Sequence, residues 1–526
     1  MTETTSTLID RLKNKSLYPH PVREFDVIET HISWVILTGE YAYKIKKSVD
    51  FGFLDFSTLE KRKHCCIEEL RLNRRLAAPL YMDVITITGD EETPEISGAG
   101  PVIEYAVKMK QFEQSDQLDR MLLNGNLSTD LIDRVSVLIA AFHTEKAQPA
   151  PPESAFGSLE HVHHPVLENF SQLNSLLRDR GDLDRLERLQ TWSNNEKNRL
   201  IKTFASRKEE SCIRECHGDM HLANIAVFHK EIVIFDCIEF NPNLSWIDVI
   251  SEAAFLFMDL DSHGRQDFAF RFLNHYLQQT GDYRGIELLR YYLCYRAMVR
   301  AKVECLRSIQ QPDQPVKDVH INYRSYMKLA ESYIQPARPA IIITHGLSGS
   351  GKTTITSLLM EHFNAIRIRS DIERKRMAGL SATESSQSGV AQDLYSRDNT
   401  QKTYDYLIHL SDLISSNGFN SIIDATFLKH NQREMFRLQA QRNNLAFVIL
   451  NFQAPDEVLR QWITERQKQG DDASEANLKV LDHQQQTQEP LRADEMRHVL
   501  TIDTSTQVDL PHLCSELEQL IQTQLT

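Results

Sequence analysis

The sequence is poor in cysteine, and its cysteines form no pattern that would hold a disulfide framework or a zinc ion. There are eight in 526 residues, with no CxxC pair and no Cys/His set at metal-ligand spacing. This usage predicts reduced, mostly buried thiols in a cytoplasmic protein. A histidine cluster, His161, His163 and His164, precedes Pro165. We expect these histidines to form a solvated turn rather than a metal site.

The sequence also lacks a long apolar run and an excess of basic charge. No stretch approaches the roughly 18 apolar residues of a membrane span, and no basic segment followed by an apolar core opens the chain. We therefore expect neither a membrane span nor a signal peptide. The net charge of −14 argues against a surface built for phosphate backbones or anionic lipid. Glycine (19) and proline (17) are too few for a collagenous or low-complexity chain.

What is present is the composition of a folded protein that is too long for one domain. Hydrophobic residues make up 41% and charged residues 25% of the chain, which is ordinary for a globular protein. At about 150 residues per domain, the length predicts three to four domains, or two large ones. Two Pro-containing breaks, SIQQPDQPVK (308–317) and QPARP (335–339), predict the main boundary.

Local patterns predict different architectures on the two sides of that boundary. After it, apolar strands alternate with helices to the end of the chain, which predicts a parallel α/β sheet. Before it, the pattern changes from mainly β to mainly helical. The elements predicted there are a hairpin of 31–37 and 42–47 around Thr38-Gly39-Glu40, a helix at 59–77, strands at 84–88 and 101–112, helices at 131–146 and 165–208 with a break at Gly181, and a strand–turn–strand at 213–240.

A phosphate-binding loop follows the first strand of the second part. Gly346-x-x-x-x-Gly351-Lys352-Thr353 is the Walker A pattern, with an apolar strand before it and a helix after it. Glycines let backbone N–H groups turn toward phosphate oxygens, and the helix N-terminus adds partial positive charge. Lys352 can bridge the β- and γ-phosphates, and Thr353 can ligate Mg²⁺. The predicted nucleotide contacts are Gly346, Leu347, Ser348, Gly349, Ser350, Gly351, Lys352, Thr353 and Thr354.

Two carboxylates follow the loop at positions where they can take part in phosphoryl transfer. Asp371 comes after a short β-like run, roughly twenty residues beyond the loop lysine. It can orient or deprotonate an acceptor hydroxyl, or it can be only the N-cap of the next helix, and both interpretations stay open. Asp424 ends the apolar strand in SIIDATF (421–427) and can hold the Mg²⁺ shell, with a simple strand-ending turn as the alternative.

Arginines further along the second part can close over the transferred phosphoryl group. Arg460 and Arg466 lie in a helical run before Gly470-Asp471-Asp472. An arginine on a mobile lid excludes water and stabilises the transferred charge. We predict this role for Arg466, with a solvated helix face as the less favoured alternative. For Arg460 the solvated helix face is an equal alternative.

These elements together resemble the small P-loop kinases, which include polynucleotide 5′-kinase-like, gluconate-kinase-like and zeta-toxin-like phosphotransferases. The resemblance covers about 340–500 and rests on the Walker A loop, Ser370-Asp371-x-x-Arg374 and Asp424-Ala-Thr-x(6)-Arg433. It implies that Asp371 activates the acceptor, and that Arg374 and Arg433 contact the substrate or its phosphate. It also implies that Arg466 is the lid arginine.

The first part carries a second set of residues suited to phosphoryl transfer. ECHGDMHLANIAVF (215–228) contains Asp219 and, five residues later, Asn224, and Asp236 follows at the end of the strand in IVIFDCIEF (232–240). Asp219 can orient an attacking hydroxyl, while Asn224 and Asp236 can share one or two Mg²⁺ ions that neutralise a triphosphate.

This spacing resembles the aminoglycoside phosphotransferase and choline-kinase-like branch of the protein-kinase fold, over about 25–310. That branch has H-G-D-x-x-x-x-N and D-x-x-E, as found here at 217–224 and 236–239. The resemblance implies that Lys44 pairs the α/β-phosphates, with Lys46 as the runner-up and Lys47 solvated. The remaining implied roles are Glu69 as the helix partner of the lysine, with Glu68 as the alternative, residues 107–112 as the adenine-reading hinge, and Asp248 as a structural residue under the catalytic loop.

The chain departs from that branch in one respect and gives no acceptor signature in another. No glycine-rich loop precedes Lys44, and the hairpin has only Gly39, which leaves open a domain that binds nucleotide poorly. The helical insert at 147–210 has no dense acidic cluster of the kind expected for a polycationic aminoglycoside. We therefore do not predict antibiotic resistance.

The order of the two parts resembles bacterial two-domain proteins in which an aminoglycoside phosphotransferase-like domain is fused to an ATP-binding domain. We predict a kinase-like N-lobe at 1–110, a kinase-like C-lobe at 111–310, a linker with a helix at 311–338 and a P-loop kinase domain at 339–526. The predicted function is a bifunctional kinase that uses ATP and Mg²⁺ on hydroxyl acceptors. Small molecules are the preferred acceptors, and a nucleic-acid end or a nucleoside stays open as the acceptor of the C-terminal domain. The alternative is a nucleotide-gated regulatory protein with a pseudokinase first half.

Overall fold

The computed structural model describes residues 8–52, 54–310, 316–382, 384, 396–469, 474 and 476–525, except the side chains of 308–321 and 469. The chain forms two compact units. The first comprises Met1–Gln172 and Lys197–Asp259, and the second comprises Leu173–Glu196 and Leu260–Thr526. Parts of the predicted linker (311–315) and of the predicted lid (470–473) lie outside the described residues.

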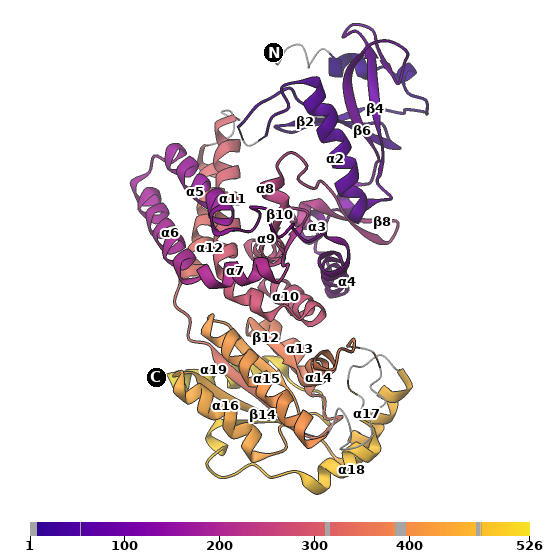
Figure 1. Cartoon of the computed structure of the whole chain (residues 1–526). Coiled ribbons are helices and arrows are strands. Elements are labelled where there is room, and N and C mark those ends of the chain that lie inside the picture. The colour runs from indigo at the N-terminus through magenta and orange to yellow at the C-terminus, as the bar shows by residue number, and fades with distance from the viewer. Residues whose placement is uncertain are drawn as a thin grey trace. The chain divides into compact units, whose positions relative to one another are not determined.

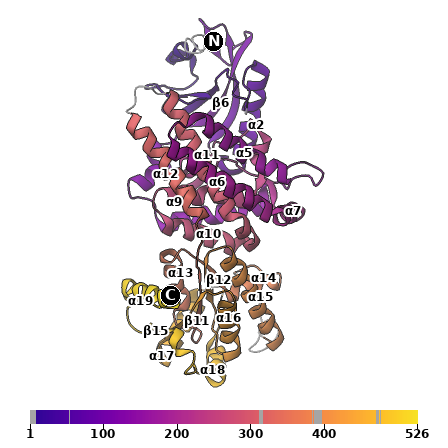
Figure 2. The same cartoon turned by 90° about the vertical axis from the view of Figure 1, so that its left-hand side faces the viewer.

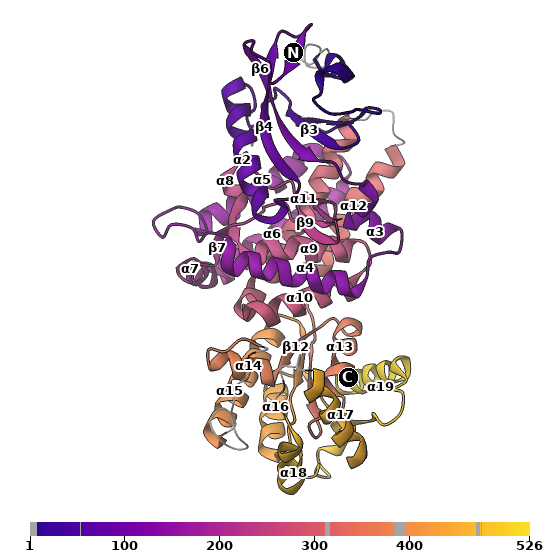
Figure 3. The same cartoon turned by 90° about the vertical axis from the view of Figure 1, so that its right-hand side faces the viewer.

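The first unit begins with a six-stranded antiparallel sheet in the order β1-β2-β3-β6-β4-β5. Its strands are β1 (Asp26–Glu29), β2 (Ser33–Leu37), β3 (Tyr41–Lys46), β4 (Tyr81–Gly89), β5 (Pro94–Ile96) and β6 (Val102–Lys110). The predicted hairpin is confirmed, because β2 and β3 pair antiparallel. The predicted helix at 59–77 is α2 (Leu59–Ala77), which starts at an N-cap on Thr58 and packs against β4 and β6 (Figure 3).

The rest of the first unit is mainly helical, with two small β-ribbons. Its helices are α3 (Leu118–Leu123), α4 (Thr129–Ala141), α5 (Leu159–Leu176), α7 (Ile201–Glu209), α8 (Pro242–Ser245) and α9 (Val249–Ser262), of which α5 and α9 continue into the second unit. Between α5 and α7 the chain forms α6 (Arg180–Arg199), which belongs to the second unit up to Glu196. The ribbons pair β7 (Ile213–Glu215) with β10 (Trp246–Asp248), and β8 (Ile225–Phe228) with β9 (Glu231–Ile234).

Two local predictions in this region are wrong. The histidine cluster is not a solvated turn but part of α5, with Pro165 inside the helix and His163 buried. Burial of Val166 and Phe170, four residues apart on one helix face, outweighs the hydrogen bond that proline removes. The predicted break at Gly181 lies just before α6 instead, because Asp179 Oδ1 accepts the N–H of Asp182 and starts the helix there.

The second unit combines a helical layer with a P-loop sheet. The layer consists of α10 (Gln266–Thr280), α11 (Ile286–Gln310) and α12 (Val316–Ile334), and α11 and α12 run along each other (Figure 1). The sheet has the order β12-β13-β11-β14-β15 and every pairing in it is parallel. Its strands are β11 (Ala340–His345), β12 (Ala365–Arg369), β13 (Asn420–Asp424), β14 (Ala446–Gln453) and β15 (Val499–Asp503).

Helices cover both faces of this sheet, which confirms the predicted parallel α/β architecture. Figure 2 shows α13 and α19 on one side of β11 and α15 and α16 on the other. The first side is a continuous apolar core, in which Ile342 of β11 packs with Leu359 and Leu517. The helices of this part are α13 (Lys352–His362), α14 (Ser370–Met377), α15 (Arg397–Ser416), α16 (His430–Arg442), α17 (Asp456–Gln469), α18 (Leu478–Thr487) and α19 (Leu510–Leu525).

Over the described residues, none of the helices combines the length and the apolar character needed to span a membrane. All eight cysteines are free thiols, and seven of them are buried. The predicted thiol state therefore agrees with the structure.

Candidate active sites

In the first unit, two lysines of β3 converge on one glutamate of α2. Side chains alternate along a strand, so Lys44 and Lys46 point to the same side of the sheet. Lys44 Nζ lies 2.9 Å from Glu69 Oε1, and Lys46 Nζ lies 2.7 Å from Glu69 Oε2. Lys44 also pairs with Asp236, and Lys46 pairs with Glu239. The predicted partner Glu69 is thus in place, and both the first choice and the runner-up lysine reach it.

The alternatives to this pair point elsewhere. Glu68 pairs with Arg71, and Lys47 pairs with the exposed Glu29. Glu69 itself is completely buried. Burial opposes its ionisation, but the ammonium groups of Lys44 and Lys46 outweigh burial and lower the pKa of Glu69. The same arrangement raises the pKa of Lys44 against the effect of burial, chiefly through Asp236, so Lys44 and Glu69 favour their charged forms.

The predicted catalytic loop brings Asp219 and Asn224 together. Asn224 Nδ2 donates to the Asp219 carbonyl at 2.9 Å and to Asp219 Oδ2 at 3.1 Å. His221 Nε2 lies 3.4 Å from the same carboxylate oxygen. The Asp219 side chain is 39% exposed, so it is held at its base and remains accessible to an incoming hydroxyl group.

Asp236 stands at the same end of the β8–β9 ribbon as Asn224, because the N–H of Phe235 donates to the Asn224 carbonyl at 2.9 Å. The backbone of Asp236 is left-handed, with φ of 65°, which costs free energy in a non-glycine residue. The hydroxyl of Tyr81 accepts the Asp236 N–H and Asn73 Oδ1 accepts the Cys237 N–H, and these bonds hold the bend.

The oxygen atoms of this end fit a hard cation. Carboxylate and amide oxygens from Asp219, Asn224 and Asp236 are the donor types that Mg²⁺ prefers. Glu239, in contrast, is buried and paired with Lys46. Lys46 therefore neutralises Glu239, and Asp236 is left as the acid beside Lys44.

Sequence reasoning missed two buried acids that bind backbone N–H groups of the loop containing Asp219. Glu252 Oε1 accepts the N–H of Gly218 at 2.6 Å, and its other oxygen binds His143 Nε2 at 2.8 Å. Asp259 Oδ2 accepts the N–H of Leu222 at 2.9 Å. Both acids lie on α9, seven residues apart in a mainly apolar helix. That spacing places them on one helix face and is the signal that could have revealed them. Asp248, as predicted, has a structural position, buried against Arg207.

In two turns of the first sheet, side chains of the protein accept the backbone N–H groups. Gln111 Oε1, at the end of the predicted hinge, accepts the N–H groups of Thr38 at 3.1 Å and Gly39 at 2.8 Å. The hydroxyl oxygen of Thr30 accepts those of Ile32 and Ser33. These two turns therefore use side chains of the protein where a glycine-rich loop would present N–H groups to phosphates.

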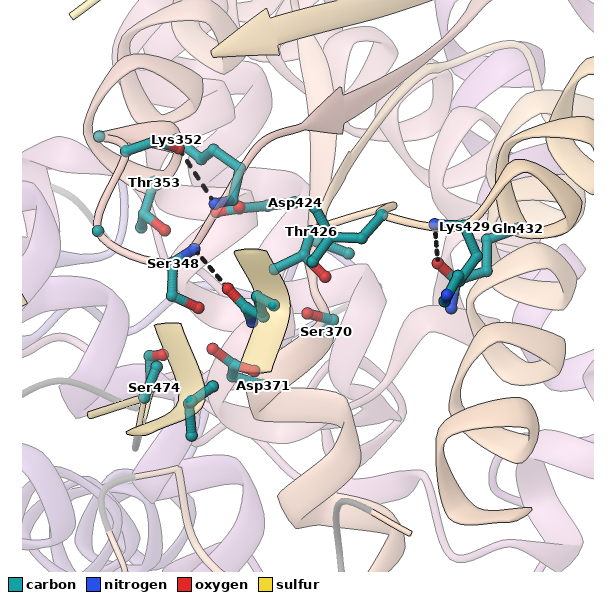
Figure 4. Close-up of a pocket in the computed structure, with 18 of the residues that line it drawn as sticks. Ser348, Lys352, Thr353, Ser370, Asp371, Asp424, Thr426, Lys429, Gln432 and Ser474 are labelled. Atoms are coloured by element: carbon teal, nitrogen blue, oxygen red, sulfur yellow. Dashed lines mark hydrogen bonds between the residues drawn. The ribbon is translucent and has the colours of Figure 1, made fainter. Parts of the chain in front are cut away.

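In the second unit, the phosphate-binding loop opens into a cavity of about 1260 Å³ (Figure 4). Its wall contains six Lys or Arg side chains, namely Lys352, Arg374, Arg397, Lys429, Arg466 and Arg492. It contains four acids, namely Asp371, Asp424, Glu465 and Glu489. A cavity richer in cations than in acids, within a chain of net charge −14, is suited to attract phosphate groups.

The loop glycines are required by the backbone and by close packing. Gly346, Gly349 and Gly351 all have positive φ, a conformation that costs little only for glycine. A Cβ atom on Gly346 would lie 2.8 Å from the Phe452 carbonyl oxygen, and one on Gly349 would lie 2.9 Å from Ile463 Cγ1. The loop is thus pressed between β14 and α17, with its curvature fixed.

Lys352 begins α13 and folds back over the loop. Its Nζ donates to the carbonyl oxygens of Gly346 at 3.0 Å and Leu347 at 2.6 Å. Burial lowers the pKa of Lys352 to about 8, and Asp424 and Asp371 oppose that effect. The glycine backbone, the helix N-terminus and this lysine together fit a phosphate group.

Asp424 ends β13, as predicted, and lies beside α13. Thr356 Oγ1 is 3.3 Å from Asp424 Oδ2. Arg367 of β12, a residue that sequence reasoning missed, donates to the carbonyl of Thr353 at 2.9 Å and lies 3.3 Å from Thr356 Oγ1. A hydroxyl at 353 and a carboxylate at 424 are hard-cation donors, and Arg367 fixes the helix turn that carries the hydroxyl.

Asp371 lies in the first turn of α14 and lines the cavity, paired with Arg374 at 3.1 Å. The N-cap alternative for Asp371 is wrong, because α14 starts at Ser370 and its cap position is Arg369. Figure 4 shows Asp371 and Ser370 beside the loop residue Ser348.

The remaining predicted arginines have different surroundings. Arg466 lines the cavity from α17 and donates to the Ala476 carbonyl at 2.9 Å. Arg460 pairs with Asp456 and Asp482 on the surface. Arg433 is completely buried and binds Glu495 at 2.7 Å. Arg433 thus joins α16 to the segment before β15. We therefore propose a structural role for Arg433 in place of the predicted substrate contact.

The fold and the two sites define the class of protein. The first unit has an antiparallel sheet, a buried Lys–Glu pair and a loop that brings Asp219 and Asn224 together, and the second contains a parallel P-loop α/β domain, which implies nucleotide binding. Residues 341–491 match the family described as an AAA domain.

Relatives of similar length match most of the chain. It is 30% identical over 458 residues to the uncharacterized protein Rv2004c of Mycobacterium tuberculosis, a match that covers 86% of this chain and 89% of the relative. The uncharacterized protein Mb2027c of Mycobacterium bovis matches with the same values. The chain belongs to the family of these mycobacterial proteins.

Among solved structures, choline kinase from Cryptosporidium parvum is 12% identical and covers 64% of this chain and 96% of its own, with a TM-score of 0.38. A gluconokinase from Sinorhizobium meliloti is 18% identical and covers 36% and 96%, with a TM-score of 0.26. Both scores are low, so the strand order and site geometry, rather than these likenesses, define the class.

Proposed function

We propose that the protein is a bifunctional ATP-dependent phosphotransferase with two Mg-ATP sites, each transferring a γ-phosphate to a hydroxyl group of a small molecule. The observation that carries the proposal is that each unit contains a lysine suited to bind phosphate and a separate carboxylate that remains accessible. These residues are Lys44 and Asp219 in the first unit, and Lys352 and Asp371 in the second. Free thiols and ATP use agree with a cytoplasmic location.

At the first site, the protein's contribution is positioning and charge. Lys44, fixed by Glu69, would bind the α/β-phosphates, and Asn224 and Asp236 would hold Mg²⁺, which supplies neutralisation of the triphosphate charge. Asp219 accepts the proton of the acceptor hydroxyl as the oxygen–phosphorus bond forms. The adjacent bond from Asn224 Nδ2 to Asp219 Oδ2 keeps that carboxylate oriented.

At the second site, the loop 346–354 would hold the phosphates with Lys352, and Thr353 and Asp424 would hold Mg²⁺. Asp371 orients the acceptor hydroxyl and takes its proton, while Arg374 steadies Asp371 and the bound acceptor. Arg466 approaches from α17 and compensates charge on the transferred phosphoryl group.

One observation favours a second candidate function, a nucleotide-gated regulatory protein with a pseudokinase first half. The N–H groups of Thr38 and Gly39, in the turn between β2 and β3, are bound to Gln111. Those of Ile32 and Ser33, in the turn between β1 and β2, are bound to Thr30, so phosphate contacts would rest on Lys44 and the metal ligands. Under this alternative, the first unit would not bind Mg-ATP, and the P-loop would act as a slow ATPase switch.

A metabolite screen with γ-labelled ATP on the full chain tests the proposal. Asp219→Ala should remove one labelled product and Lys352→Ala a different one. Glu68→Ala, a change of a half-buried acid of α2 that pairs with Arg71, serves as the control and should keep both. If neither variant changes any transfer, the bifunctional kinase fails. If only Asp219→Ala is silent and the first unit ignores Mg-ATP, the regulatory alternative holds.

The small-molecule nature of the acceptor has its own test. The net charge of −14 disfavours a long nucleic-acid footprint. Oligonucleotides should therefore bind weakly, with little dependence on salt concentration. Tight, salt-sensitive binding that Lys429→Ala and Arg492→Ala weaken would instead make a nucleic-acid end the acceptor of the second site.

A further inference from the structure

Helix α14 has two faces with different surroundings. Asp371 and Arg374, three residues apart, line the cavity. Glu373 and Arg376, also three residues apart, lie on another face of the same helix. They contact the helical layer that precedes the P-loop sheet in the chain. A displacement of the second face therefore moves the first face as well.

The contact centres on a buried carboxylate. Tyr283, in the short turn between α10 and α11, donates its hydroxyl to Glu373 Oε1 at 3.1 Å. Arg376 Nε donates to Glu373 Oε2 at 3.0 Å, and Arg376 Nη2 donates to the Gln278 carbonyl at 2.6 Å. Glu373 is completely buried, and Tyr283 is nearly so. Burial raises the pKa of Tyr283, so its hydroxyl stays a proton donor.

The fit at this point leaves no room for a side chain at the end of α10. Gly281 closes α10 with a φ of 71°, and a Cβ atom there would lie 2.5 Å from Arg376 Nη1. The arginine therefore packs directly on the helix end. The backbone at the end of α10, Tyr283, Glu373 and Arg376 thus form one close-packed contact, which we call the joint.

A second contact fixes the strand that leads into α14. The side chain of Asn274, on α10, donates to the Ala365 carbonyl at 2.8 Å and accepts the Arg367 N–H at 2.6 Å. β12 is the outer strand of the sheet, so Asn274 supplies the partners that a neighbouring strand would otherwise provide. Strand and helix are thus held by the same helical layer at two points.

We propose that Tyr283 is a positioning residue of the P-loop site, which acts through Glu373 and Arg376 to set the place of Asp371 and Arg374. This inference rests on the proposed role of Asp371 as the group that orients the acceptor. In-line transfer requires the attacking oxygen to be aimed to within a fraction of an ångström, and small misplacements cost large factors in rate. Mg-ATP is bound mainly by the loop 346–354, so its affinity is independent of the joint.

The test uses the full chain with Asp219→Ala, so that only the P-loop site turns over ATP, with water as the probe acceptor. Tyr283→Phe removes one hydroxyl and should lower kcat roughly tenfold, while the KM for Mg-ATP stays within about twofold. Hydrogen exchange of 370–377 should speed up. Glu373→Gln, which keeps the shape of the side chain, should act in the same direction.

Tyr333→Phe is the matched control, because it removes a tyrosine hydroxyl from a carboxylate, Asp261, at 2.6 Å in the same unit without touching α14. It should leave kcat and the exchange of 370–377 unchanged. Equal effects of the two tyrosine variants, or an unchanged kcat in Tyr283→Phe, would overturn the inference. If Lys352→Ala leaves turnover intact, the proposed function of this site fails, and the exchange at 370–377 then decides whether the joint holds α14.

Discussion

Two lysines on one strand face, two residues apart, have different surroundings and therefore different expected roles. Lys44 lies beside Asp236, whose side chain is 46% exposed, whereas Lys46 is almost completely buried between Glu69 and Glu239. A cation beside an exposed acid can exchange that acid for a phosphate group. A cation enclosed by two buried acids is needed for folding, because those acids have nothing else to neutralise them.

Replacement of each lysine by methionine should separate these roles. Lys46→Met leaves buried carboxylates short of a partner and should lower the free energy of unfolding by about 3–5 kcal/mol. Lys44→Met should cost clearly less stability but remove nucleotide binding from the first unit. Urea unfolding and Mg-ATP titration of both variants measure the difference. Lys47→Met, which removes only the ion pair with the exposed Glu29, is the control. Equal loss of stability in the two variants would contradict this division.

The lowered pKa of Lys352 leads us to expect that the protein takes up a proton when it binds a nucleotide. Burial lowers its pKa to about 8 in the free protein, so near pH 9 most molecules carry a neutral amine there. A bound triphosphate favours the ammonium form, and binding should therefore take up close to one proton at about pH 9 and little at about pH 7. Calorimetry in buffers of different ionisation heat measures this uptake.

The control is Lys352→Arg, whose guanidinium stays charged throughout this range. It should show no pH-dependent uptake. An uptake that persists in this variant would assign the proton to another group.

What the sequence could predict at the scale of residues depended on how local the signal was. The Walker A loop is contiguous, so its residues were found together. Lys44, Glu69 and Asp236 come from three separate segments and needed a resemblance to connect them. Arg433 was assigned to the substrate because the sequence could not show Glu495, which lies 62 residues further along the chain and occupies its guanidinium.

At the scale of elements, the loop before α13 is shaped by what packs around it. Gly349 and Gly379 have similar backbone angles, with φ of 82° and 73°, but a Cβ atom at 349 meets Ile463, whereas one at 379 meets nothing within 4 Å. Alanine at either position therefore suffers the same left-handed strain of about 1–2 kcal/mol. Only Gly349→Ala also presses on α17.

We expect Gly349→Ala to weaken Mg-ATP binding at the P-loop by at least tenfold, an effect of about 1.4 kcal/mol. Gly379→Ala should lose stability without losing nucleotide affinity. Equilibrium binding of a fluorescent ATP analogue, together with thermal unfolding, distinguishes the two effects. Equal affinity in the two variants would show that backbone angle alone matters in the loop.

Elements with strong periodicity or caps were predictable, and those decided by long-range packing were not. Helix 59–77 has its N-cap threonine and a long charged run, and its predicted bounds match α2. The histidines before Pro165 read as a loop because proline and polar residues dominate locally. Their helix is decided by buried apolar partners that no local pattern contains.

At the scale of the whole molecule, each of the two compact units should respond to its own ligand. A ligand that binds only the folded state stabilises it, by about 2.7 kcal/mol at a hundred times its Kd. A non-hydrolysable Mg-ATP analogue should therefore raise the unfolding temperatures of two transitions in scanning calorimetry. Lys352→Ala should cancel the rise of one transition, and Lys44→Ala that of the other.

Loss of both rises in a single variant would contradict two separate sites. A rise that only Lys352→Ala removes would leave the first unit without a nucleotide and favour the regulatory alternative.

The asparagine that completes the outer strand of the P-loop sheet has a practical consequence for dissecting this chain. A fragment that starts at residue 339 keeps the loop, the cavity and all five strands, but it lacks Asn274 and Tyr283 and bares the flank of β12. An unprotected flank of that kind invites a second copy to pair along it. Such a fragment should self-associate in light scattering, while the full chain, in which Asn274 occupies the flank of β12, should stay monodisperse.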